Sequence, residues 1–131
     1  MVKNNTRAGG LWTEARYNSF IKSAIRSMSH RWPVKFEVLR AAQAGRHINK
    51  KTGKLAMHYW CAECKEMHPA KDVQVDHIDP IVPIEMIGKL DWNVVIDNAL
   101  CEADGLQVLC KPCHSVKSKE ENAERRAAKK Q

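Results

Sequence analysis

Two pairs of cysteines, each with the spacing Cys-x-x-Cys, constrain the fold of this chain more than any other feature of its sequence. The four residues are Cys61, Cys64, Cys110 and Cys113, and 45 residues separate the two pairs. A Cys-x-x-Cys turn places two sulfurs on one side of a tight loop, so two such turns supply the four thiolates of a tetrahedral zinc site. The spacing therefore predicts a structural zinc site that joins two distant segments. Buried thiols or a redox pair are the alternatives, although a redox pair needs only one such turn.

The length and charge of the chain point to a basic protein of one domain with additional helix. It has 131 residues, 22 Lys+Arg against 15 Asp+Glu, and a formal net charge of +7. This charge favours a polyanionic partner, with nucleic acid first and an anionic membrane surface second. A basic protein without a specific partner is the alternative.

The sequence contains no feature of a membrane-spanning or secreted protein. No run of 18 apolar residues is present, and the N-terminus has no apolar segment of the kind found in secretory signals. The paired cysteines fit a reduced compartment, so we expect the cytoplasm. Cys101, which is left unpaired, is expected to be a small buried apolar residue.

Hydrophobic periodicity and turn residues predict an α+β chain in three parts: a mobile arm (1–10), a helical region with a basic loop (11–54), and a module with mixed structure (55–131). Thr13 is the predicted N-cap of the first helix, and Pro33 opens the second. The four tryptophans are each expected to lie in the core. The predicted elements are helices over 13–31, 33–45 and 114–130, a helical excursion within 84–100, and strands over 55–60, 71–78 and 106–109.

Asp76 and His77 lie between the two cysteine pairs, and His114 directly follows the second pair. Closing the zinc site would bring these three residues into one neighbourhood. An imidazole such as that of His77 suits a general base near neutral pH, and a carboxylate such as that of Asp76 suits Mg²⁺ or Mn²⁺. We therefore expect Asp76 and His114 to hold a second metal, open to solvent, with His77 beside it. Each of these residues is a weak signal alone, and their combination with the cysteine pairs is specific.

Over about residues 58–121 the chain resembles the HNH endonuclease family, and most of all the small HNH nucleases that bacteriophages encode. The likeness is carried by 61–64, 75–80 and 106–114, together with Lys117. It implies a ββα-metal fold with a four-cysteine zinc site, preceded by helices and followed by a C-terminal helix. It also implies a metal-dependent DNA endonuclease in the host cytoplasm. His77 would be the general base, and Asp76 and His114 would hold a catalytic Mg²⁺, Mn²⁺ or similar ion.

One position departs from the family pattern. An asparagine that braces the loop of the base histidine usually precedes the Leu-Gln strand, and Gly105 stands in that place. A backbone carbonyl of the turn at 103–105, or the side chain of Asn98 or Asp104, is expected to replace it. The base and the metal ligands are intact, so the departure does not predict an inactive protein.

Basic residues outside the motif suggest where DNA would be held. A loop before the first cysteine pair carries candidate phosphate contacts, and a solvated loop is a nearly equal alternative. Lys117 is a further candidate that could help stabilise charge at the reacting phosphate, whereas Lys111 and the basic residues beyond it read as a solvated helix. The candidate loop residues are Arg46, Lys50, Lys51 and Lys54.

A non-catalytic, zinc-stabilised DNA-binding module is the alternative function. It would share the cysteine pairs and the charge, but it would not need Asp76, His77 and His114 together. A zinc deaminase is excluded because no His-x-Glu accompanies the cysteines. The sequence leaves open the DNA sequence preference, nicking or double-strand cleavage, the biological role (homing is one of several), and whether the protein is a monomer or a homodimer.

Overall fold

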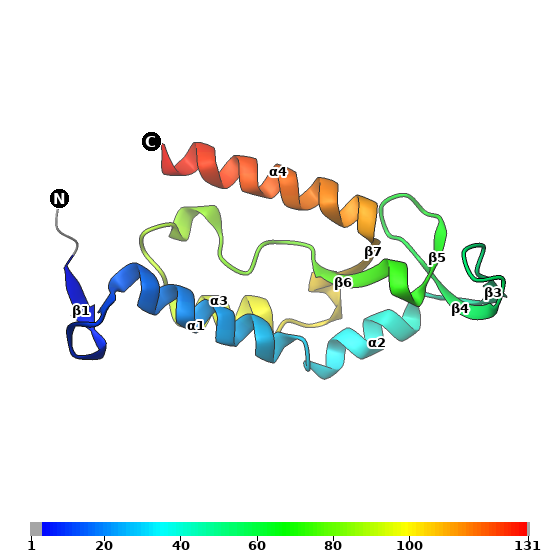
Figure 1. Cartoon of the computed structure of the whole chain (residues 1–131), viewed down its shortest axis with the longest axis horizontal. Coiled ribbons are helices and arrows are strands. Elements are labelled where there is room, and N and C mark those ends of the chain that lie inside the picture. The colour runs from blue at the N-terminus through cyan, green and yellow to red at the C-terminus, as the bar shows by residue number, and fades with distance from the viewer. Residues whose placement is uncertain (1–3, 131) are drawn as a thin grey trace. The chain divides into compact units, whose positions relative to one another are not determined.

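Figure 1 shows the chain as a computed structural model, which describes residues 4–130. Within these residues, the elements form three antiparallel sheets, β1-β2, β3-β4-β5 and β6-β7, together with four α-helices, so the fold is α+β as predicted. The helices and strands are β1 (Asn5–Arg7), β2 (Trp12–Thr13), α1 (Glu14–Ser29), α2 (Pro33–Ala41), β3 (Gln43–Ile48), β4 (Leu55–Trp60), β5 (Met67–Pro69), β6 (Val73–His77), α3 (Trp92–Ala99), β7 (Leu106–Cys110) and α4 (Lys111–Lys129).

The chain divides into two compact units at Trp32–Pro33. We call residues 1–32 the N-terminal unit and residues 33–131 the C-terminal unit. This boundary falls inside the helical region that the sequence predicts over 11–54. All four paired cysteines, Asp76, His77 and His114 belong to the C-terminal unit.

The N-terminal unit is a short hairpin followed by one helix. β1 pairs antiparallel with β2, and Gly9 and Gly10 turn the chain between them with positive φ angles of 66° and 92°. The side chain of Thr13 accepts a hydrogen bond from the Arg16 amide at 3.2 Å, which confirms the predicted N-cap of α1. Residues 1–3 of the predicted arm lie outside the described part of the chain, and the rest includes a paired strand (Asn5–Arg7) and a 3₁₀ turn (Ala8–Gly10).

The C-terminal unit begins with a helix and a three-stranded sheet that the sequence predicts only in part. α2 ends at Ala41, four residues before the predicted end, and Gly45 with φ 93° takes part in an irregular pairing of β3 with β4. The basic stretch at 46–54 is therefore half strand and half turn, and the turn is closed by the amide of Gly53, which donates to the Asn49 carbonyl at 2.7 Å. β5 is a further strand that sequence periodicity misses because it has three residues.

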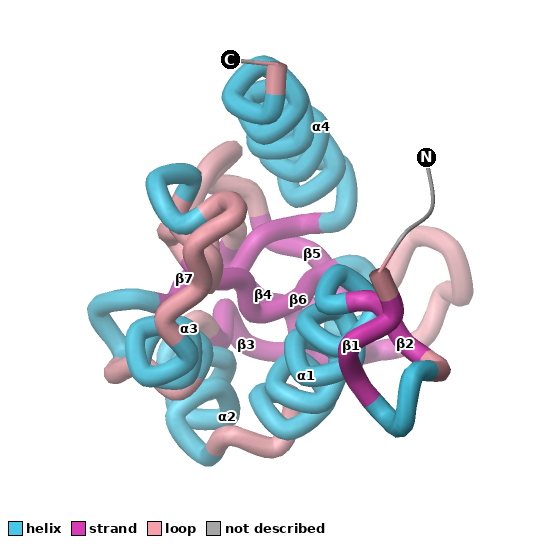
Figure 2. Tube along the Cα trace, turned by 90° about the vertical axis from the view of Figure 1, so that its left-hand side faces the viewer, coloured by secondary structure: helices cyan, strands magenta, loops and turns pink. Residues whose placement is uncertain are grey.

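β6, β7 and α4 follow one another in space as a hairpin-like pair of strands and a helix (Figure 2). The register places Asp76 opposite Gln107 and Val73 opposite Cys110. β7 has four buried residues out of five, so it forms the centre of this part of the fold, and α4 starts at the residue after it. This order brings the end of β6 and the first turns of α4 together.

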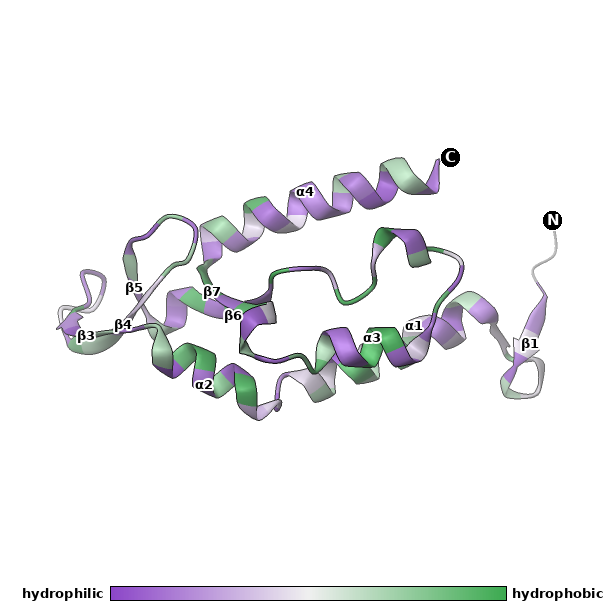
Figure 3. Cartoon of the chain, turned by 180° about the vertical axis from the view of Figure 1, so that it is seen from behind, coloured by the Kyte–Doolittle hydropathy of each residue, from purple (hydrophilic) through white to green (hydrophobic). Residues whose placement is uncertain are grey.

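α3 lies between β6 and β7 in the sequence, and it carries the most buried side chains of the C-terminal unit. Val95 and Ala99 are both 0% exposed, and the Asp91 side chain caps the helix by accepting the Asn93 amide at 3.0 Å. The predicted excursion over 84–100 is thus a 3₁₀ turn at Ile84–Met86 followed by this short helix. α4 by contrast is hydrophilic along much of its length (Figure 3), which agrees with a helix that is largely solvated.

Two predictions about buried residues are wrong. Trp60 is 48% exposed, so it does not lie in the core. Cys101 is half-buried rather than buried. Among residues 4–130, no helix combines the length and the apolar character needed to cross a bilayer.

Candidate metal and catalytic site

The four paired cysteines come together at the junction of β4, β7 and α4. Their four sulfur atoms all lie within 4.8 Å of one another, and the Sγ atoms of Cys64 and Cys110 are 4.0 Å apart. A tetrahedral zinc site with Zn–S bonds of about 2.3 Å requires S···S separations of about 3.8 Å. The cluster can therefore hold a structural metal such as zinc with little movement, and none of the five cysteines forms a disulfide.

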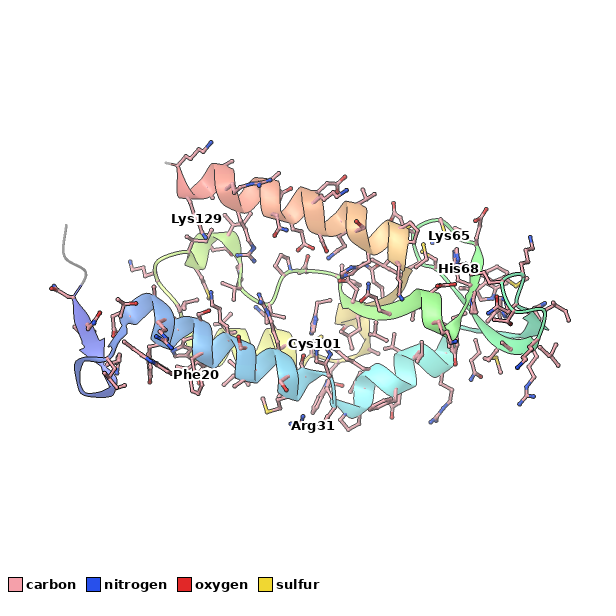
Figure 4. The ribbon with its side chains drawn as sticks, in the orientation of Figure 1. Phe20, Arg31, Lys65, His68, Cys101 and Lys129 are labelled. Carbon is pink, nitrogen blue, oxygen red and sulfur yellow. The ribbon has the colours of Figure 1, made fainter. Side chains whose placement is uncertain are left out.

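The first Cys-x-x-Cys turn is shaped by the backbone around it. Lys65 adopts a positive φ of 63°, the left-handed conformation that closes the turn, and its amide donates to the Cys61 carbonyl at 3.1 Å. The amide of Ala62 donates to the Val108 carbonyl at 2.8 Å, which attaches the turn to β7. Lys65 and His68 lie beside the start of α4 (Figure 4), where the second cysteine pair is found.

The sulfurs differ in how readily they lose a proton. Burial opposes ionisation of Cys61, but backbone amides of Cys110, Cys64 and Glu63 donate to its sulfur and together lower its pKa to about 6. Cys113 shows the opposite behaviour, because its hydrogen bond with Cys110 and its burial raise its pKa to about 12. One thiolate is thus available near neutral pH, and the remaining ligands release their protons when a metal binds.

A second group of ligand atoms shares one cysteine with this cluster. Cys64, Glu66 and His68 also lie close together, and the His68 Nε2 is 3.6 Å from the Cys64 sulfur. The four-thiol set fits zinc better, because thiolates are the preferred soft ligands and two of its members, Cys61 and Cys110, are almost fully buried. His68 is then a hydrogen-bond partner for the Cys64 thiolate rather than a ligand.

Asp76 and His114 lie side by side, as expected from the sequence. The His114 Nε2 is 3.5 Å from the Asp76 Oδ1, and the Asp76 side chain is only 11% exposed. Two neighbouring ligands of an octahedral Mg²⁺ lie about 3.0 Å apart, since Mg–ligand distances are about 2.1 Å. These two side chains therefore have the spacing and the chemistry to share one divalent ion.

The other oxygen of Asp76 is held by residues of β7 and α4. Gln107 donates its Nε2 to the Asp76 Oδ2 at 3.2 Å, and the Lys117 ammonium approaches the same oxygen at 3.0 Å. Lys117 also donates to the His77 carbonyl at 2.9 Å and to Glu121 at 2.8 Å. Burial lowers the pKa of Lys117, but the hydrogen bonds to Glu121 and Asp76 outweigh it and raise the pKa above its ordinary value. Lys117 is thus a charged bridge between Asp76, the His77 carbonyl and Glu121.

His77 is fixed by a backbone carbonyl of α3. Its Nε2 lies 2.8 Å from the Ala99 carbonyl oxygen, which can only accept a hydrogen bond, so Nε2 carries the proton. The Nδ1 of His77 is then the basic nitrogen. The residue that orients the His77 ring is thus Ala99, through its carbonyl, and not the turn at 103–105.

The residues expected to replace the missing asparagine have related but different roles. The Gly105 carbonyl accepts the Ile78 amide at 3.0 Å, and the Asn98 side chain donates to the Ile81 carbonyl at 3.2 Å. Both bonds hold the chain directly after His77. A Cβ at position 105 would lie 2.8 Å from the Cys101 sulfur, so a larger residue there would require Cys101 to move.

Lys35 is a charged residue of this region that the sequence analysis missed. It is 8% exposed on α2, which packs against β6 and β7, and it is electrostatically coupled to Cys101 and Asp76. Burial lowers its pKa below the ordinary value, while those two neighbours act to raise it. Its burial could have been found from the sequence, because Lys35 has the same helical spacing as the apolar residues Val38, Leu39 and Ala42 and so lies on one face of the predicted helix with them.

The candidate DNA-contacting residues of the basic loop lie together on the β3-β4 hairpin. Arg46 is on β3, the other three are in or beside the turn, and all four are exposed. Lys51 is within 3.8 Å of Asp72, with its side chain 79% exposed. The structure thus gathers the basic residues Arg46, Lys50, Lys51 and Lys54 on one solvent-facing hairpin.

A groove of about 500 Å³ borders the Asp76 site. Gln107 and Lys117, both of which contact Asp76, form part of its wall, and Ile78 and Val116 expose apolar surface to it. The groove therefore lies where β7 meets α4, beside two of the residues that hold the Asp76 carboxylate.

No model of a protein family, no curated protein and no solved structure matches this chain. The functional reading accordingly rests on the motif in the sequence and on the geometry of these residues.

Proposed function

We propose that the protein is a metal-dependent endonuclease of HNH type that hydrolyses phosphodiester bonds in DNA. The observation that carries the proposal is the pairing of Asp76 with His114 at 3.5 Å, at the end of the strand that also carries His77, whose Nε2 is fixed by the Ala99 carbonyl. The four-cysteine cluster supports it, because Cys113 directly precedes His114 and a zinc ion there would fix the start of α4. β6, β7 and the first turns of α4 would form the ββα-metal unit of that family.

His77 would activate the attacking water. Its Nδ1 accepts a proton as the water oxygen bonds to phosphorus, and the resulting imidazolium is stabilised by its Nε2–H bond to the Ala99 carbonyl. The bond from phosphorus to the 3′ oxygen breaks and that oxygen takes up a proton from solvent, which leaves 5′-phosphate and 3′-hydroxyl ends. Lys117 and Gln107 keep the Asp76 carboxylate in place during this step.

A divalent ion such as Mg²⁺ or Mn²⁺, held by Asp76 and His114, would supply stabilisation of the negative charge that grows on the phosphate and on the departing oxygen. The two side chains fit such an ion by spacing and ligand type, because a carboxylate oxygen and an imidazole nitrogen both coordinate Mn²⁺ and similar metals.

The decisive experiment is cleavage of supercoiled plasmid by the zinc-loaded protein with Mg²⁺ or Mn²⁺ added, compared with His77→Ala and with His30→Ala as a matched control. His30 is an exposed histidine outside the site. General-base catalysis contributes about 10²- to 10⁴-fold, so His77→Ala should lose at least about a hundredfold in rate while His30→Ala cuts normally. Equal cleavage by the two variants would remove His77 as the base.

A non-catalytic DNA-binding module remains the second candidate, and one observation favours it. The Asp76 carboxylate is already compensated by Lys117 and Gln107, so its environment is complete without a metal. DNA retardation without cleavage under any divalent ion would establish this alternative.

A further inference from the structure

The positive charge of the chain is concentrated in its N-terminal unit. Residues 1–32 contain six Lys or Arg and one Glu, a net charge of +5 out of the total of +7. The remaining residues, which include the whole candidate site, have a net charge of +2. The N-terminal unit, which does not contain the candidate site, should therefore provide most of the long-range attraction to phosphates.

One exposed face of α1 combines cations, hydroxyls and an aromatic ring without any acid. Its members recur at spacings of three and four residues, so they are neighbours on the helix surface, and all are exposed. We call them the Arg16–Ser27 face. They are Arg16, Ser19, Phe20, Ser23, Arg26 and Ser27.

The acid nearest in sequence does not neutralise this face. Glu14 is the single carboxylate of the N-terminal unit in the sequence, and its side chain is hydrogen-bonded to Arg7 at 2.7 Å and to Thr6 at 2.8 Å. Arg7 and Glu14 thus compensate each other, which leaves Arg16 and Arg26 as uncompensated charges on α1.

Aromatic rings support the first of these arginines. The Arg16 guanidinium lies 4.8 Å from the centroid of the Trp12 ring, and Trp12 meets Phe20 edge-on with centroids 5.0 Å apart. Phe20 is 59% exposed and projects from α1 (Figure 4). A guanidinium over one ring beside an exposed second ring is the combination by which proteins hold phosphates and stack on bases.

From these observations we infer that the Arg16–Ser27 face binds the backbone of a nucleic acid. Arg16 and Arg26 neutralise phosphates, the serine hydroxyls donate to phosphate oxygens, and Phe20 contacts a base or sugar. The face extends over about 18 Å of helix at 1.5 Å per residue, enough to span several phosphates. A membrane surface fits less well, because an interfacial helix needs a broad apolar face and this one has a single aromatic ring. The inference goes beyond the proposed function, since it holds whether or not the protein cuts DNA.

Binding of a short fluorescent DNA duplex to the zinc-loaded full chain tests this inference. Every protein carries His77→Ala and no divalent ion is added, so cleavage does not enter the result. Arg16→Gln/Arg26→Gln should weaken binding and reduce the slope of log affinity against log salt by about 1.8, roughly 0.9 for each lost phosphate contact. The matched control is Arg40→Gln/Arg126→Gln, which removes two exposed arginines of the C-terminal unit and the same net charge.

A second variant guards against damage to the fold of the N-terminal unit, since Arg16 contacts Trp12. Ser19→Glu/Ser23→Glu adds negative charge to the same face, leaves that contact in place, and should also weaken DNA binding. Equal loss in the face variants and in the control would reduce the effect to net charge and overturn the inference. So would unchanged DNA binding in Arg16→Gln/Arg26→Gln combined with lost binding to phosphatidylserine vesicles, which would assign the face to a membrane.

Discussion

Lys117 lies where three acceptors converge, and its charge has two opposite consequences for the candidate site. Its ammonium supports the Asp76 oxygen and the His77 carbonyl, yet it also places a positive charge 3.0 Å from a carboxylate that would bind a divalent ion. The support should favour catalysis, whereas the like charge should oppose metal binding. Replacing Lys117 should therefore raise the affinity for the divalent ion and lower the rate of DNA cleavage.

We expect Lys117→Met to bind Mn²⁺ severalfold more tightly and to cut DNA more slowly at saturating metal. Titration of Mn²⁺ against cleavage rate gives both quantities from one series. Lys119→Met, which removes an exposed lysine of the same helix, serves as the control and should change neither. Weaker Mn²⁺ binding in Lys117→Met would show that Lys117 acts only as a support for Asp76.

The contact between position 105 and Cys101 can be tested in the same way, because a side chain at position 105 would press on the Cys101 sulfur. Gly105→Ala places a methyl group 2.8 Å from the Cys101 sulfur, and such overpacking costs about 1–3 kcal/mol. Adding Cys101→Ala removes that sulfur and should restore part of the loss, as measured by urea unfolding of the zinc-loaded protein. A double variant no more stable than Gly105→Ala would place the strain elsewhere.

At the scale of elements, the four cysteines join the end of β4, the end of β7 and the start of α4. Structural zinc contributes on the order of 10 kcal/mol or more to the folding of small zinc modules. We expect Cys110→Ala to lose one zinc per chain and most of the cooperative thermal transition, while Cys101→Ala keeps both. Metal analysis with thermal melting followed by circular dichroism measures the two effects, and a Cys110→Ala variant with full zinc content would contradict the four-thiol site.

The sequence predicts these elements unevenly, for physical reasons. α1, α2 and β6 have apolar residues at helical or strand spacing, α4 is rich in helix-forming residues, and the cysteine spacing alone is enough to anticipate the sulfur cluster. β3 and β5 escape detection because one includes Gly45 and the other has three residues. The Ala99 carbonyl could not be anticipated, since a backbone carbonyl has no residue signature. Lys35 and Glu121 did leave signals in the sequence, because Lys35 lies on the apolar stripe of α2 and Glu121 stands four residues after Lys117 on α4. The proximity of Lys35 and Lys117 to Asp76 arises only through tertiary packing.

The molecule as a whole divides its charge and its candidate chemistry between two units. We expect residues 33–131, expressed alone, to bind one zinc and to keep the Asp76–His114 pair, because the cysteines and these residues lie within one compact unit. This fragment has a net charge of +2, compared with +7 for the full chain, so its affinity for DNA should be lower and should depend less on salt concentration. Zinc content and salt-dependent binding of this fragment, beside the full chain, measure both. Undiminished DNA affinity would show that the N-terminal unit contributes nothing.

The order of the sequence also controls when the candidate site can exist during synthesis. Asp76 and His77 leave the ribosome well before His114, and His114 directly follows the last of the four clustered cysteines. If the protein cuts DNA, a truncated or zinc-starved chain would therefore be harmless to the cell that makes it. The same sulfurs that stabilise the fold would act as a safeguard against premature damage to the genome.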